Sequence, residues 1–181
     1  WRAPNCILHP AGSGISFTRI WKGLNELAIL GLIEPVKTHM YLVQAAGSSP
    51  IVNAFEAGTL HVNPVVPDTV AKSIAIGNPA DGYDALKIAR ESGGGACAVT
   101  DKELIEGIKL LAQTEGIFAE ATGGAVIASL KKLAASGLIK RRELTVAFIT
   151  GAGPRTQETV ADIVQSCTIQ PTLKSFREVF G

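Results

Sequence analysis

The residues best suited to chemistry lie in a glycine-rich turn near the start of the chain. Residues 11–16 read AGSGIS and stand between an apolar run and a stretch with helical spacing. Glycine lets the backbone approach an anion closely, and free N–H groups at a helix start can hold a phosphate, assisted by the hydroxyls of Ser13 and Ser16. A tight strand-to-helix connection needs such a turn in any case, so a purely structural role stays open. The pattern does not fit G-x-G-x-x-G, because Phe17 occupies the last position, nor G-x-x-x-x-G-K-[ST].

A second turn follows the last apolar run of the chain. Residues 144–149 predict a continuous apolar strand, which runs directly into Thr150, Gly151 and Gly153. A hydroxyl at a strand end can be purely structural. Placed opposite a pyridine nitrogen, the hydroxyl would adjust how strongly a bound ring withdraws electrons, without fully protonating that nitrogen.

Histidine and cysteine are not arranged for metal binding. The three histidines have no Cys, Asp or Glu partner at ligand spacing, and the three cysteines are far apart and outside any C-x-x-C pattern. These residues are His9, His39 and His61, and Cys6, Cys97 and Cys167. We therefore predict no metal site and no disulfide framework, which favours a reducing compartment.

Composition indicates a globular chain with one sizeable core. Of 181 residues, 46% are hydrophobic and 18% are charged, and 17 basic residues balance 16 acidic ones without a run of like charge. This balance disfavours nucleic acid and acidic membrane surfaces as partners. No apolar stretch approaches the roughly 20 residues of a membrane span, so we expect a cytoplasmic protein.

The elements that must position these turns alternate between strands and helices. Strands are predicted at residues 6–8, 40–43, 96–99, 116–119 and 144–149. Helices are predicted at 15–30, 51–57, 81–92, 100–114 and 122–136, with a last one after Thr172. Asp81 and Thr100 are suited to cap helices, and residues 58–79 lack a helical period. This order predicts an α/β fold whose sheet is mostly parallel and has helices on both faces.

Read in chain order, five segments resemble threonine synthase across nearly the whole chain. They are AGSGISFTRIWKGLNEL, QAAGSSPIVNAF, AKSIAIGNPADGYDALKIARESGG, TDKELIEGIKLLAQTEGIFAEATGGAVIASLKKLAASGLI and VAFITGAG. The resemblance is to the C-terminal part of that pyridoxal 5′-phosphate (PLP) enzyme. It implies the large-domain part of a fold-type II PLP enzyme, which converts O-phospho-L-homoserine and water to L-threonine and phosphate. The turn at residues 76–79, IGNP, makes the match more specific than one to tryptophan-synthase-β-like proteins in general.

The resemblance also implies roles for individual residues. The glycine turn would hold the PLP phosphate, Thr150 would face the pyridine nitrogen, and Glu120 would line the cofactor. The implied cofactor-binding residues are Gly12, Ser13, Gly14, Ile15, Ser16, Glu120, Thr150 and Gly151. Two departures put the substrate in doubt: no proline follows Glu120, and residues 154–155 read Pro-Arg where relatives usually have Leu-Lys.

No catalytic residue is assigned, because the lysine that forms the Schiff base with PLP lies, by the resemblance, upstream of Trp1. Lys22 and Lys72 lack the Lys-Asp setting expected of that lysine. We therefore expect residues 1–181 to be a single α/β domain, a C-terminal fragment of a longer enzyme that is inactive alone. Its expected partners are a small amino-acid substrate, the missing N-terminal segment and, in the full-length enzyme, a second subunit of a homodimer.

Two alternatives stay open. A paralogue of the same fold, such as a cysteate synthase or an amino-acid dehydratase, would act on another amino acid. A non-catalytic half that pairs with another chain would keep the fold without the activity.

Overall fold

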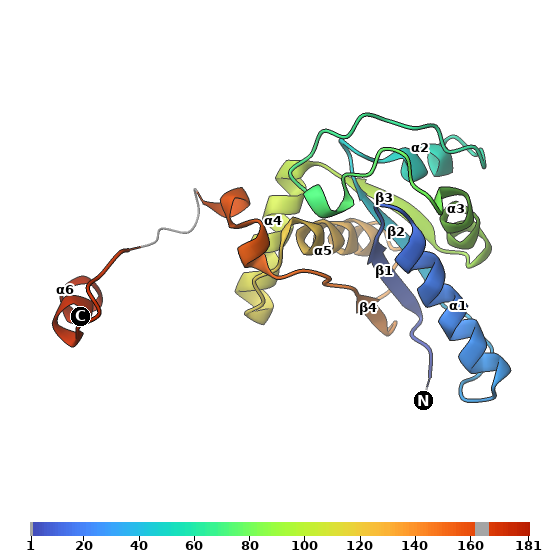
Figure 1. The fold of residues 1–181 in the computed structure, drawn as a ribbon. Helices are drawn as coiled ribbons and strands as arrows, with labels where there is room; N and C mark the ends of the chain where they lie inside the picture. Colours follow the sequence, from blue (N-terminus) through green and yellow to red (C-terminus); the bar gives the residue numbers. More distant parts are fainter. Residues whose placement is uncertain (1, 162–166) are drawn as a thin grey trace.

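The computed structural model describes residues 2–161 and 167–181, and its centre is a parallel sheet (Figure 1). In the described residues the sheet has four strands in the order β3-β2-β1-β4, and every neighbouring pair is parallel. The strands are β1 (Cys6–Pro10), β2 (His39–Ala45), β3 (Gly95–Val99) and β4 (Thr145–Ala147). The prediction of an α/β fold with a mostly parallel sheet is confirmed.

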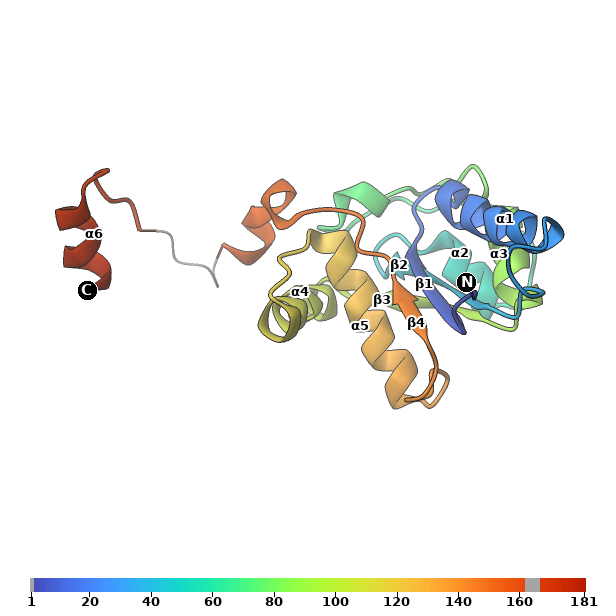
Figure 2. The ribbon, with the colours of Figure 1, turned by 90° about the horizontal axis from the view of Figure 1, so that it is seen from below.

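Helices cover both faces of this sheet, as predicted (Figure 2). One face packs against α1 (Ile15–Ile29), α2 (Pro50–Glu56) and α3 (Gly82–Glu91) around the buried ring of Phe17. The other face packs against α4 (Asp101–Glu115) and α5 (Ala121–Ala135). Because β1 and β2 are buried on both faces, their sequences are nearly continuous apolar runs.

Local signals set the helix ends. Thr100 and Glu103 form the predicted capping box at the start of α4: the Glu103 amide donates to the Thr100 hydroxyl at 3.3 Å, and the Thr100 amide donates to the Glu103 carboxylate at 2.8 Å. A hydrogen bond from Lys132, together with the Thr100 amide, lowers the pKa of Glu103 to about 2. Gly31 and Gly137 end α1 and α5 with positive φ angles of 70° and 75°.

One strand prediction was too long, and another was wrong. The run at 144–149 forms a strand only over Thr145–Ala147, and none of its side chains is buried, because β4 lies at an edge of the described sheet. Residues 116–119 form no strand: Gly116 ends α4 with a φ of 67°, and only Ala119 makes a bridge, to Ala152. Apolar runs of this length do not reveal whether a pairing partner is present.

The irregular segment at 58–79 crosses the carboxyl ends of the strands, as Figure 1 shows. Asp68 donates its amide to Gly47, just after β2, at 2.8 Å, and Val70 donates to the Asp101 carboxylate, just after β3, at 3.0 Å. Within the segment, Lys72–Ile74 forms a single 3₁₀ turn, η1. This lack of regular structure was predicted, and its anchors place η1 beside the site described below.

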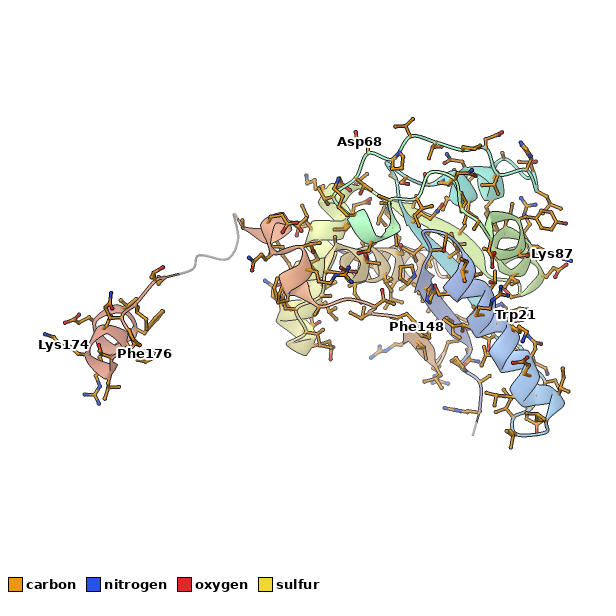
Figure 3. The ribbon with its side chains drawn as sticks, viewed as in Figure 1. Trp21, Asp68, Lys87, Phe148, Lys174 and Phe176 are labelled. Atoms are coloured by element: carbon orange, nitrogen blue, oxygen red, sulfur yellow. The ribbon has the colours of Figure 1, made fainter. Side chains whose placement is uncertain are left out.

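The last helix is α6 (Leu173–Phe180), capped as predicted by Thr172, whose hydroxyl accepts from the Ser175 amide at 3.2 Å. Figure 3 shows Lys174 and Phe176 on α6, apart from the other helices and strands. Among the described residues, no helix combines the length and apolar character needed to cross a membrane. The prediction that residues 1–181 form a single domain stays a prediction.

Candidate functional site

The glycine turn leaves β1 at its carboxyl end and starts α1. Gly14 is the N-cap of α1 with a φ of 86°, a left-handed conformation that strains any other L-residue. The buried amide of Gln44 supports the turn, donating to the Ala11 carbonyl at 3.0 Å while its oxygen accepts from two amides of α2. The turn therefore has a fixed shape before any ligand arrives.

This turn has the donors that a phosphate dianion needs. The first amides of a helix have no carbonyl partner within it, and the helix dipole favours negative charge there. The first turn of α1 carries no acidic residue, Ser16 is exposed and Ser13 is half-buried. The residues present thus fit a phosphate group. Gly12 serves packing as well, because a Cβ there would lie 3.1 Å from the Cα of Ile74.

The second turn follows β4 and lies beside the first. Strands β1 and β4 are parallel neighbours, with Leu8 opposite Ala147, so their carboxyl ends meet at the same edge of the sheet. The amide of Phe148 extends this pairing by donating to the Leu8 carbonyl at 3.0 Å. Thr150, predicted at the end of a buried strand, is instead exposed, and its hydroxyl makes no hydrogen bond to another described residue.

Glu120 is brought to the second turn by pairing between two distant segments. Its amide donates to the Gly151 carbonyl at 3.0 Å, and a Cβ on Gly151 would lie 2.2 Å from the carboxyl carbon of Glu120. Glu120 is only 2% exposed, at the N-cap of α5, where its side chain makes no capping bond. Gly151 therefore leaves the space that a buried carboxylate occupies.

The carboxylate of Glu120 has two polar partners, and neither was singled out from the sequence as a site residue. The Ser73 hydroxyl donates to it at 3.3 Å, and the Nε of Arg155 lies 3.7 Å away. Ser73 belongs to η1, and Arg155 ends the 3₁₀ turn η2 (Gly153–Arg155). Because Ile74 of η1 also contacts the position of Gly12, η1 bridges the two turns.

His9 lies on β1, beneath both turns. Its ring centroid is 5.1 Å from that of Phe148 and 6.3 Å from that of Phe17, and its Nδ1 has no hydrogen-bond partner among the described residues. Burial lowers the pKa of His9 to about 4, so the ring is neutral at physiological pH. Phe148 and Trp21 of α1, both labelled in Figure 3, pack against the same apolar cluster, which places this aromatic group on the α1 face of the sheet.

A groove of about 810 Å³ lies elsewhere, between α4 and α5. Four lysines and two glutamates line it, and it contains none of the predicted site residues. The charged residues that line the groove are Lys102, Lys109, Lys131, Lys132, Glu103 and Glu106. Within the described chain, no group of three His, Cys, Asp or Glu side chains is placed to hold a metal ion.

The structure thus brings the predicted residues of both turns to one edge of the sheet. Gly12, Ser13, Gly14, Ile15 and Ser16 lie at the start of α1, and Glu120, Thr150 and Gly151 lie around the neighbouring turn. Their roles toward a cofactor stay predictions. One of the missed residues had a signal in the sequence: Arg155 stands where the resemblance led us to expect lysine.

Comparison with known sequences finds that residues 2–151 match the family described as pyridoxal-phosphate dependent enzyme. The chain is 42% identical over 154 residues to threonine synthase of Methanocaldococcus jannaschii, an alignment with 84% of this chain and 38% of that protein. It is 39% identical over 184 residues to threonine synthase of Methanosarcina acetivorans, covering 100% of this chain and 45% of that protein. The chain therefore spans less than half of these relatives.

Solved structures show the same fold. Threonine deaminase isoform 2 from Solanum lycopersicum superposes with a TM-score of 0.67 at 18% identity, over 90% of this chain and 45% of that one. A fungal L-serine ammonia-lyase from Rhizomucor miehei gives a TM-score of 0.67 at 18% identity, over 89% and 50%. At such identities the likeness concerns the fold alone.

Proposed function

This chain belongs to the family of pyridoxal-phosphate dependent enzymes, and we propose that the protein it represents is a threonine synthase. The proposed reaction converts O-phospho-L-homoserine and water to L-threonine and phosphate. The relatives that support this are threonine synthases 39–42% identical to most or all of the chain, and the reaction of the whole protein is inferred from them.

One observation supports assigning roles to individual residues: the glycine turn lies at the carboxyl ends of the parallel strands, immediately before α1. We propose that the backbone of Gly12, Gly14 and Ile15 holds the PLP phosphate, together with the hydroxyls of Ser13 and Ser16. Donors fixed in advance bind an anion without the cost of ordering the loop. The support is the left-handed Gly14, the absence of acid in the first turn of α1 and the accessible hydroxyls.

The second turn would hold the ring. PLP, when bound, supplies an electron sink that stabilises negative charge on substrate carbon atoms. The exposed Thr150 hydroxyl is free to bond the pyridine nitrogen, and being neutral it would leave that nitrogen without a full positive charge. The buried Glu120 carboxylate, held by Ser73, would line the same wall. The lysine that carries PLP is proposed to lie outside these 181 residues, consistent with the share of the relatives that the chain spans.

The phosphate assignment is tested by comparing PLP with pyridoxal, which has the same ring but no phosphate. We expect the 181-residue chain to bind PLP at least about tenfold more tightly, because charge-assisted hydrogen bonds are lost with pyridoxal. After borohydride reduction, peptide mapping should find no single lysine labelled stoichiometrically. Stoichiometric labelling of one lysine, with turnover of phosphohomoserine, would show that the chain itself contains the catalytic base.

The reaction is tested on the protein in the form that its gene encodes. Phosphate and threonine should appear in equal amounts from phosphohomoserine, whereas threonine and serine should yield little 2-oxo acid. Release of 2-oxo acid from threonine or serine instead would identify a dehydratase and leave the cofactor assignment intact.

A further inference from the structure

Asp81 occupies the N-cap of α3 without capping it. An aspartate at this position normally accepts hydrogen bonds from the first amides of its own helix, as the sequence predicted here. In the structure its side chain makes no capping bond to α3. The carboxylate must therefore be held by other groups.

Those groups belong to the first turn of α1. The Thr18 hydroxyl lies 2.9 Å from the Asp81 carboxylate, and the guanidinium of Arg19 lies 3.7 Å from the same oxygen. The Thr18 hydroxyl is also 2.8 Å from the Ile15 carbonyl, so its single proton serves one of two acceptors. Thr18 is buried, whereas the Arg19 side chain is 65% exposed, which makes Thr18 the better ordered partner.

The backbone of Asp81 contacts the glycine turn directly. Its amide donates to the Ser13 carbonyl at 2.9 Å, and its carbonyl oxygen would lie 2.8 Å from a Cβ on Gly14. Asp81 thus contacts the glycine turn through its backbone and the start of α1 through its carboxylate. No other described hydrogen bond from α3 reaches the glycine turn.

We propose that Asp81 is a positioning residue that holds the glycine turn and the first turn of α1 in the conformation that binds phosphate. This inference rests on the proposed function, because it assumes that the turn receives the PLP phosphate. Two opposing effects make it testable. Losing the Thr18 contact should loosen the turn and weaken phosphate binding, whereas losing the negative charge should by itself strengthen it.

Three variants separate these effects. Asp81→Ala removes both contact and charge, Asp81→Asn keeps an oxygen that can accept from Thr18 but removes the charge, and Thr18→Val removes only the hydroxyl. The matched control is Asp84→Ala, because Asp84 also carries a negative charge in the first turn of α3 but is exposed and makes no hydrogen bond or ion pair with the described residues of α1.

The readout is the Kd of each protein for PLP and for pyridoxal. We expect Asp81→Ala and Thr18→Val to weaken PLP binding about tenfold and leave pyridoxal within about twofold, since the loss passes through the phosphate. Asp81→Asn, which keeps the contact and loses the charge, should bind PLP at least as tightly as wild type, and the Asp84→Ala control should change neither Kd. The double variant Asp81→Ala/Thr18→Val should be no weaker than either single one.

Amide hydrogen exchange supplies a readout that needs no ligand. In the ligand-free chain, the amides of residues 12–16 should exchange faster in Asp81→Ala and Thr18→Val than in Asp84→Ala. Unchanged exchange there would overturn the proposal, and so would equal weakening of PLP and pyridoxal or tighter PLP binding by both Asp81 variants. If wild type failed to discriminate PLP from pyridoxal, the phosphate assignment itself would be wrong, and the role of Asp81 with it.

Discussion

The two glycine turns leave neighbouring parallel strands, yet they need glycine for different reasons. At the first turn, Gly14 has a φ of 86°, and a Cβ would lie 2.8 Å from the backbone oxygen of Asp81. At the second, Gly151 has no positive φ, and a Cβ would meet the side chain of Glu120. The first turn is thus fixed by backbone and the second by a side chain that can move. Substitution should break the first turn but only rearrange the second.

The largest effect should come from Gly14→Val. A β-branched residue in the left-handed region, forced against the Asp81 backbone, should cost about 4 kcal/mol of unfolding free energy and abolish PLP binding. The control is Gly23→Val in the same helix, where a Cβ would meet nothing within 4 Å. The free energies of unfolding of both variants are measured by urea unfolding. Equal values would show that the first turn is not fixed by its backbone.

The next effect concerns pH, because His9 contacts an aromatic ring beside each turn. The folded pKa of about 4 is below the usual 6.5, so the unfolded chain binds a proton that the folded chain excludes. The stability due to neutral His9 is therefore complete above pH about 6.5 and is lost as pH falls toward about 4, by up to roughly 3 kcal/mol.

The variant His9→Phe keeps an aromatic ring but cannot titrate. Urea midpoints of wild type and variant, measured across that pH range, should diverge steadily as pH falls, with wild type losing more. The difference between the two midpoints reports His9 alone, because acidic groups titrate in both proteins. Glu103, with a pKa of about 2, loses its contribution to stability at lower pH than His9 does. Parallel curves would mean that His9 is not held neutral by burial.

A smaller effect is expected from Gly151→Ala. The new Cβ should displace the Glu120 carboxylate from Ser73 at a cost of about 1–2 kcal/mol, less than at Gly14. In Gly151→Ala/Glu120→Ala the obstructing side chain is gone, so the double variant should be more stable than the sum of the single losses predicts. Strict additivity in a double-mutant cycle would contradict the steric coupling.

The smallest effect on stability should be that of Thr150→Val. Its hydroxyl is exposed and makes no hydrogen bond to another described residue, so unfolding free energy should change by less than about 0.5 kcal/mol. If it bonds the ring nitrogen, then in the protein that its gene encodes PLP absorbance should shift and turnover of phosphohomoserine should fall by about tenfold or more. Thr145→Val, on β4 before this turn, is the control, and matching spectra for both variants would remove Thr150 from the site.

Local interactions explain most of what could be predicted. The capping box at Thr100, the Thr172 cap and the positive φ of Gly31 and Gly137 depend on residues within a few positions of each other, so the sequence alone located these helix ends. The apolar runs likewise indicated β1 and β2, because strands buried on both faces admit few polar residues. The run at 144–149 misled about burial, since apolar residues alone do not show that β4 lies at an edge of the described sheet.

By itself, the sequence determined the alternation of strands and helices, the parallel sheet and the position of the glycine turn at the start of α1. Only the tertiary structure decided that the Asp81 carboxylate leaves its own helix for Thr18, and that Ser73 and Arg155 meet at Glu120. These pairs are 63, 47 and 35 residues apart. Side chains so distant in sequence meet only after the sheet has placed their segments, so no local pattern records the contact.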